Sequence, residues 1–130
     1  MPLEADFISY ITGIGAVSSK IGTRLYLHKL PQGVTLPAVV YQRISRSSPQ
    51  THDQKASGLL FERFQFTVYA RTGEDTSAVE GAFFNALEGF KGSMGSTVVG
   101  SVLHAGTTDG YDPDHELEYT TMDYMIGYQK

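Results

Sequence analysis

Four histidines offer the main metal-binding chemistry of the chain, at His28, His52, His104 and His115. Zinc sites usually present their ligands as local pairs with an H-x-H or H-x-x-x-H spacing, often beside cysteines. None of the four histidines has such a neighbour. The chain also has no cysteine, which excludes disulfides, thiolate metal ligands and a cysteine nucleophile. The sequence therefore predicts neither a metal site nor a bound cofactor.

The residue types of a serine hydrolase lie together in one polar stretch, at Ser47, Ser48, His52 and Asp53. A catalytic triad is defined by its geometry on a rigid frame, and many hydrolases hold the serine in a G-x-S-x-G turn. The sequence contains no such turn. We interpret the stretch as a solvated loop and predict no catalytic residues, so the chain is not expected to be an enzyme.

The densest acidic cluster consists of Asp109, Asp112, Asp114 and Glu116, with His115 among them. A calcium loop requires the pattern D-x-[DN]-x-[DN]-G and a glutamate further on. The stretch D-G-Y-D-P-D-H-E departs from that register and contains a proline. A tight turn, in which aspartates accept hydrogen bonds from nearby backbone, accounts for the cluster. A cation site, or an acidic contact with a partner, is the alternative for this turn.

Two segments show the apolar spacing of a helix. Residues 3–14 place Leu3, Phe7 and Ile11 in one stripe, and glycines at 13 and 15 end the pattern. Residues 75–90 carry a wide apolar face made of Val79, Ala82, Phe83, Ala86, Leu87 and Phe90. Acidic residues at the start of this segment and a lysine at its end complement a helix dipole.

Four segments indicate strands, at residues 36–45, 59–71, 97–105 and about 117–128, and residues 24–27 suggest a further short edge strand. The clearest is 59–71, because Phe64, Phe66, Val68 and Ala70 alternate with polar residues. In the first strand Tyr41, Gln42 and Arg43 must point to alternate faces, so they cannot converge on one substrate. The G-S-M-G-S stretch before the strand at 97–105 is interpreted as a linker, and the stretch T-T-D-G-Y-D-P-D-H-E before the last strand as a turn.

These elements predict a two-layer α+β domain that spans residues 1–130. We expect a mainly antiparallel sheet of about four strands with two helices packed on one face. A long polar loop at about residues 46–58 separates two of the strands, and loops of that length in compact domains are usually functional or disordered. Its polar side chains, Arg46, Gln50, His52, Asp53 and Lys55, are the candidate assembly contacts.

The composition narrows the class of protein. The chain has 130 residues, of which 41% are hydrophobic and 18% charged, which is typical of a globular domain. Its formal net charge of −4 argues against a nucleic-acid-binding protein, which needs a basic face to displace counterions. Its apolar runs fall far short of the roughly 20 residues that span a bilayer, so we expect no membrane segment.

Several segments taken together resemble the small tail-completion, or head-to-tail joining, proteins of long-tailed bacteriophages. The resemblance covers nearly the whole chain in order and lies in these pieces: GTRLY (22–26), the PQG turn (31–33), LPAVVYQRIS (36–45), RFQFTVYART (63–72), FKG (90–92) and YDPDHELEYTTMDYMIGYQ (111–129). The chain departs from the family pattern around ITGIGAVSSK (11–20), where a longer helix or a different loop is expected.

The resemblance implies a non-enzymatic subunit that adds to the end of an assembled tail and joins it to the head. Related tail-terminator proteins assemble as a ring, commonly six-fold, around the channel through which DNA passes. The implied partners are tail-tube and head-connector proteins and further copies of the chain, without sequence-specific DNA binding. The implied location is the head-proximal end of the virion tail, and the host cytoplasm during assembly.

A different class of function competes with this one. A small regulatory α+β domain that binds a small molecule, or a metal at the acidic turn of residues 109–116, would have a similar composition. Titration calorimetry with calcium, magnesium and zinc separates the metal-binding part of this alternative from the assembly role.

Overall fold

The computed structural model describes residues 3–47, 59–95 and 97–129. Three helices occur in this part of the chain: α1 (Leu3–Thr12), α2 (Gly15–Ile21) and α3 (Gly73–Leu87). The predicted stripe of α1 is confirmed, because Leu3, Phe7 and Ile11 are all buried. None of these helices is long and apolar enough to cross a membrane.

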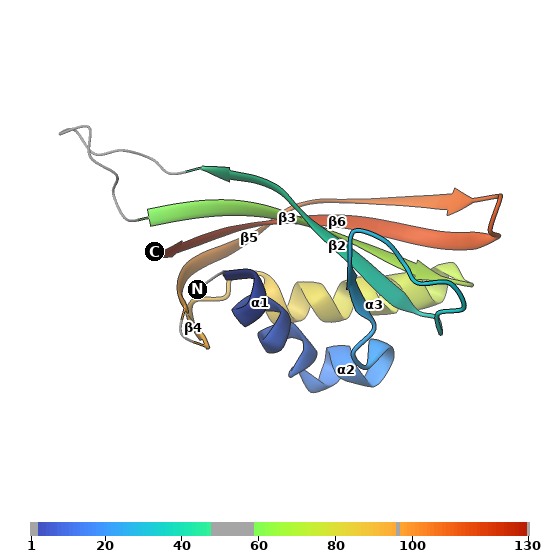
Figure 1. Cartoon of the computed structure of the whole chain (residues 1–130), viewed down its shortest axis with the longest axis horizontal. Coiled ribbons are helices and arrows are strands. Elements are labelled where there is room, and N and C mark those ends of the chain that lie inside the picture. Colours follow the sequence, from blue (N-terminus) through green and yellow to red (C-terminus); the bar gives the residue numbers. More distant parts are fainter. Residues whose placement is uncertain (1–2, 48–58, 96, 130) are drawn as a thin grey trace.

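The described strands form one six-stranded sheet in the order β1-β2-β3-β6-β5-β4. Their bounds are β1 Leu25–Leu27, β2 Ala38–Ser47, β3 Leu59–Ala70, β4 Gly92–Met94, β5 Thr97–Asp112 and β6 Leu117–Gln129. Every neighbouring pair is antiparallel except β1 and β2, which run parallel. All three helices lie on one face of the sheet, and the other face has no helix over it (Figure 1).

The two-layer α+β architecture with helices on one face agrees with the prediction, but the element counts do not. The described residues contain three helices and six strands, where two helices and about four strands were predicted. The missed helix is α2, which buries Val17 and Ile21 one turn apart. The missed strand β4 is only three residues long and lies in the predicted G-S-M-G-S linker. A segment this short shows no alternation, so only its pairing with β5 identifies it as a strand.

Two predicted boundaries are also wrong. β2 continues through Ser47, because Arg46 and Ser47 still pair with Glu62 and Phe61 of β3, so the loop does not begin at 46. β5 continues to Asp112, where a turn was predicted from residue 106 onward. The last part of β5 pairs with β6, but most of its side chains are exposed. It therefore has no buried face, and the alternation of apolar and polar residues by which a strand is predicted is absent there.

Phe66 lies at the centre of the core and connects both layers. Its ring packs against the rings of Phe7 on α1 and Phe83 on α3, with centroid distances of 5.7 and 5.3 Å. Tyr41 and Tyr124, on the two neighbouring strands, contact the same ring at 6.4 and 6.2 Å. These rings attach α1 and α3 to the middle of the sheet. Its flanks are formed by β2 with β1 on one side and by β5 with β4 on the other.

Candidate assembly surface

Of the five predicted assembly contacts, Arg46 lies in the described structure. Gln50, His52, Asp53 and Lys55 fall in residues 48–58, outside the described residues. Arg46 is part of β2, is 46% exposed, and donates from Nε to Oε2 of Glu62 at 2.9 Å. Its guanidinium therefore has a structural role at the end of the sheet where β2 ends and β3 begins.

Glu62 is the only charged residue that is buried in the described part of the chain, with 1% of its surface exposed. Besides Arg46, its Oε2 accepts a hydrogen bond from the hydroxyl of Tyr128 on β6. Its Oε1 lies 3.5 Å from Nη1 of Arg43 and accepts no hydrogen bond. We call Arg43, Arg46, Glu62 and Tyr128 the Glu62 cluster. It connects β2, β3 and β6 at the same end of the sheet.

The electrostatics of the Glu62 cluster follow from burial and charge. The hydrogen bond to Glu62 raises the pKa of Arg46 above its ordinary value. Burial, followed by the hydrogen bond to Glu62, raises the pKa of Tyr128 to about 12. Two guanidinium groups face one carboxylate, and both arginines remain more than two fifths exposed. The cluster therefore presents a net positive charge to solvent at the flank of β2.

Glu62 is not among the residues predicted from the sequence, although the sequence contains a signal for it. Glu62 has the same strand parity as Phe64, Phe66 and Val68, so period-2 alternation places its carboxylate on the buried face. A carboxylate in that position needs a charged or hydrogen-bonding partner. Arg43 and Arg46 are the partners from β2. Arg43 lies two residues after Tyr41 and therefore points to the same face, while Gln42 between them points to the other.

The uncovered face of the sheet carries side chains that pair across strands. Arg63 donates from Nε to Asp123 at 3.1 Å, and Gln42 donates to Gln65 at 3.1 Å. Thr67 and Thr121 share a hydrogen bond of 3.3 Å. Cross-strand pairs of this kind stabilise a sheet and satisfy its polar groups. The middle of this face is therefore polar and already paired within the chain.

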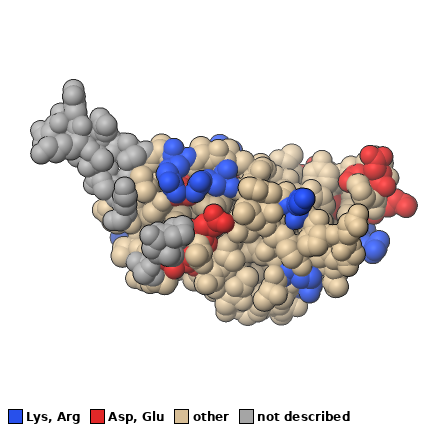
Figure 2. Space-filling view, viewed as in Figure 1, with Lys and Arg blue, Asp and Glu red and all other residues tan. Residues whose placement is uncertain are grey.

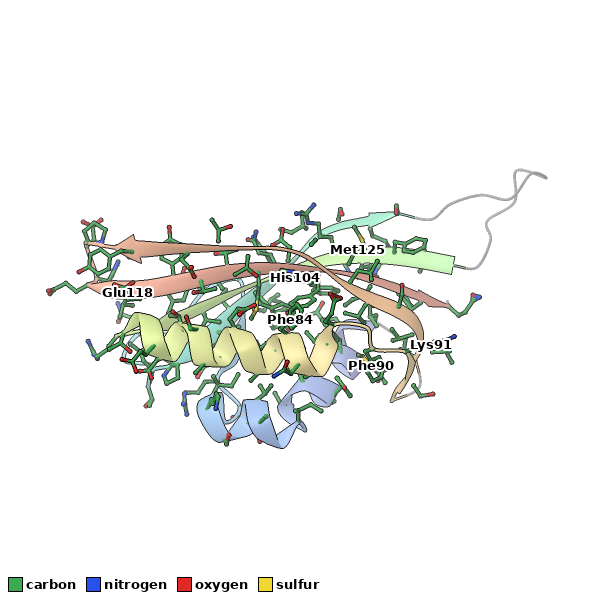
Figure 3. The ribbon with its side chains drawn as sticks, turned by 180° about the vertical axis from the view of Figure 1, so that it is seen from behind. Phe84, Phe90, Lys91, His104, Glu118 and Met125 are labelled. Carbon is green, nitrogen blue, oxygen red and sulfur yellow. The ribbon has the colours of Figure 1, made fainter. Side chains whose placement is uncertain are left out.

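Large apolar side chains that are more than a third exposed lie instead at the two flanks of the sheet. On the β1–β2 flank they are Leu27 and Ile44, and on the β5 flank they are Val98, Leu103 and Tyr111. The sixth, Phe84, is on α3, and its ring meets His104 of β5 at 5.3 Å (Figure 3). Exposed apolar groups gathered in this way are typical of protein interaction sites.

The acidic segment of residues 109–116 forms the end of β5 and the turn into β6. Asp112 accepts from the backbone N–H of Asp114 at 3.0 Å and lies 2.9 Å from Nδ1 of His115. These bonds to His115 lower the pKa of Asp112. Within the described residues no group of three or more His, Asp or Glu side chains could hold a metal ion.

A hollow of about 730 Å³ lies between this turn and the segment after β1. Its lining includes the basic groups His28, Lys29, Arg71 and His115 beside Asp112. These basic groups are ones that a small anionic ligand could contact.

Comparison with known proteins assigns the chain to a family. Residues 9–129 match the family described as tail completion protein gp17. No curated protein sequence matches the chain. A similar solved structure is a chain from the virion of a native gene transfer agent particle, with a TM-score of 0.78 and 12% identity. That match covers 98% of this chain and 95% of the other, which shows a shared fold. The chain therefore belongs to the tail completion protein gp17 family, a family of phage tail proteins.

Proposed function

We propose that this chain completes a phage tail by closing its head-proximal end and joining it to the head. The family match over residues 9–129 carries the proposal. In this role the chain forms a ring subunit around the channel through which DNA passes, and it contacts tail-tube and head-connector proteins. The net charge of −4 suits a protein that surrounds DNA without gripping it.

The flanks of the sheet support self-association. When two copies meet, removal of these exposed apolar side chains from water favours association by about 25 cal/mol of free energy for each Å² buried. The polar contacts predicted for residues 46–58 fit a second role, the choice of partner, because charges at the rim of an interface set specificity and register.

The proposal is tested by adding the purified chain to tails that lack it and imaging them by electron microscopy. We expect a ring at the head-proximal end and restored joining to heads. A variant with Gln50, His52, Asp53 and Lys55 changed to alanine should lower joining while its thermal unfolding stays unchanged. Tails that remain bare at saturating protein would remove the proposal.

Arg46→Ala serves as the matched comparison, because Arg46 also binds buried Glu62. This substitution should lower the unfolding temperature as well as joining, whereas the four substitutions in residues 48–58 should change joining alone. If all four loop substitutions leave joining intact, the contacts with the head or tail lie elsewhere on the chain.

A second candidate function is favoured by the basic hollow at His28, Lys29, Arg71 and His115. A small regulatory domain could bind an anionic molecule there. Calorimetry with phosphate, and with calcium, magnesium and zinc, tests this alternative, and a stoichiometric heat that Arg71→Ala abolishes would favour it over assembly.

A further inference from the structure

β5 is flanked by other elements over only part of its length. β4 pairs with its first residues, Thr97 to Val99. Further along, the end of α3 binds its outer side: Gly89 N–H donates to the carbonyl of Val102 at 2.9 Å, and His104 N–H donates to Glu88 Oε1 at 3.0 Å. On the side of β5 away from β6, no described strand or helix end pairs with the backbone of residues 105–112, and we call this stretch the free β5 edge.

β2 has a similar free stretch on the opposite side of the sheet. β1 pairs with Val39 to Tyr41, and His28 N–H donates to the carbonyl of Tyr41 at 3.0 Å. Beyond that point no described strand lies along residues 42–47 on the side of β2 away from β3, and we call this stretch the free β2 edge. Free edges present unpaired backbone N–H and C=O groups, and such rows bind other strands.

The strand directions fit an antiparallel junction between two copies. β2, β3, β6 and β5 alternate in direction, so β2 and β5 run opposite to each other. A second copy placed alongside in the same orientation therefore brings its β2 antiparallel to this β5. Through the register of β3 and β6, the free β2 edge lies level with residues 101–106, so it overlaps the free β5 edge only at residues 105 and 106. The second copy must therefore shift along the strands for the two free edges to face each other.

That offset along the strands suits a closed ring. When a sheet closes on itself, its strands tilt and successive strands are staggered. A head-to-tail contact repeats the same rotation between all neighbours, and it closes into a ring when the rotations complete one turn. A constant stagger between copies is therefore compatible with closure, whereas a two-fold contact through one edge would stop at a dimer.

The apolar groups of the two edges complement each other. Ile44 lies in the bulge of the free β2 edge and is 46% exposed, while Tyr111 on the free β5 edge is 51% exposed. Leu103, just before the free β5 edge, is 57% exposed and lies opposite Met125 of β6. Burial of these groups against the neighbouring copy would remove the exposed apolar surface that the flanks carry in the single chain.

The charges of the two edges are opposite. β2 contains Arg43 and Arg46 and no acidic residue, whereas β5 contains Asp109 and Asp112 and neither lysine nor arginine. Glu80 of α3 lies beside the free β5 edge, where it accepts from the hydroxyl of Thr107 at 3.5 Å. Lys and Arg side chains gather near the end of β2, and Asp and Glu side chains gather at the β5–β6 turn (Figure 2).

From these observations we propose that the free β5 edge pairs with the free β2 edge of a second copy of this chain, antiparallel and head to tail. The inference rests on the proposed ring and names the surfaces that build it. Backbone hydrogen bonds provide the contact, while Ile44, Tyr111 and the opposite charges fix its polarity. The uncovered sheet face, with its internally paired side chains, stays outside this junction.

The absence of cysteine permits a direct test with introduced thiols. Ser45→Cys and Ala105→Cys replace small exposed residues, one on each free edge. A bismaleimide reagent, whose spacer bridges neighbouring strands without requiring one register, is added to concentrated protein and to tails carrying it. The double variant should give a ladder of covalent oligomers, each single variant only monomer, and a mixture of the two single variants a dimer.

Dimers from a single variant would indicate a two-fold contact and overturn the proposal, as would a double variant that stays monomeric both in concentrated solution and on tails. Binding to tails, scored by electron microscopy, reports separately on the proposed function. A double variant that caps tails without cross-linking refutes the edge pairing alone, whereas one that forms a ladder in solution but never binds tails refutes the tail role alone.

A second variant tests the backbone contact itself. By the register with β6, Thr107 is the next position after Val102 and His104 whose backbone faces the outer edge. Proline there removes an outward N–H and is tolerated in an edge strand. Added to the double-cysteine protein, Thr107→Pro should lower the oligomer yield about tenfold. Thr107→Val, which keeps the N–H, is the matched control, and equal yields from both would refute backbone pairing.

Discussion

At the scale of single residues, Glu62 shows how a buried charge can persist in a small domain. A lone buried carboxylate costs several kcal/mol, so it persists only when it is paired and hydrogen-bonded. Arg46 and Tyr128 supply the hydrogen bonds, and Arg43 adds its charge from 3.5 Å. Their three strands are thereby fixed to one another at the end of the sheet that precedes residues 48–58.

The raised pKa of Tyr128 predicts a specific dependence of stability on pH. The folded hydroxyl keeps its proton up to about pH 12, whereas the unfolded chain loses it near the ordinary tyrosine value of 10.0. Between these pH values the folded state therefore binds more protons than the unfolded state. The stability that the Tyr128 hydroxyl provides is complete below pH 10 and is lost as the pH rises to about 12. Tyr128→Phe should lower the free energy of unfolding by about 1–3 kcal/mol at neutral pH.

The difference in free energy of unfolding between Tyr128→Phe and the unmodified chain should then narrow above about pH 10. Urea unfolding at roughly pH 8 and roughly pH 11 measures this difference. Tyr111→Phe, which removes an exposed hydroxyl, is the control and should run parallel to the unmodified chain over this range. If the difference in free energy of unfolding between Tyr128→Phe and the unmodified chain stays constant up to about pH 11, this would contradict the raised pKa of Tyr128.

At the scale of elements, the sequence was informative where one face is buried. The alternation of β3 and β6 and the apolar stripe of α1 predicted these elements to within a few residues, because their inward side chains fill the core. The same logic failed where pairing alone makes a strand: β4 and the end of β5 have no alternating buried face. Their partners lie close by in sequence, as Met94 pairs with Thr97 and Asp112 with Leu117, but no buried alternation marks these residues as strands. The short edge strand suggested at residues 24–27 is confirmed as β1.

The candidate site shows the same division. The sequence placed Arg46 in a polar loop, but Arg46 lies in β2, and its bond to Glu62 depends on the pairing of β2 with β3, which no local pattern states. The free edges could not be predicted from the sequence either, because an edge is recognised only when no other strand pairs beside it. Sheet order therefore has to be known before exposed residues such as Ile44 and Tyr111 can be connected to assembly.

The start of α3 gives a prediction at this scale. Thr72 is its N-cap, and its hydroxyl oxygen accepts from the backbone N–H of Asp75 at 3.2 Å. Thr72→Ala removes this acceptor and should lower the free energy of unfolding by about 1 kcal/mol. Differential scanning calorimetry should show a decrease in Tm of about 3 °C.

Thr72→Ser keeps the oxygen and is the matched control for this cap. It should restore most of the lost stability, because serine caps helices at least as well as threonine does. If the serine variant loses as much stability as the alanine variant, the methyl packing of Thr72, and not its hydrogen bond, stabilises this end of α3.

At the scale of the whole molecule, the fold separates the surfaces that hold the domain together from those left for partners. Helices cover one face, cross-strand pairs satisfy the middle of the other, and exposed apolar groups collect at the two flanks. The two flanks differ in charge, since β2 is basic and β5 acidic. A chain with two different and complementary flanks can form a directional assembly, in which every copy uses both.

This polarity predicts how self-association responds to salt. Between about 0.1 M and about 1 M salt the Debye length falls from about 10 Å to about 3 Å, so attraction between the exposed arginines of β2 and the acidic groups of β5 is screened. The rate at which oligomers form should therefore fall as salt rises, because complementary charges act mainly on association. Burial of Ile44 and Tyr111 does not depend on this screening, so oligomers once formed should persist. Stopped-flow light scattering measures the rate, and mass photometry after dilution measures persistence. An association rate that stays constant over this range would show that the opposite charges of the two edges do not guide the copies together.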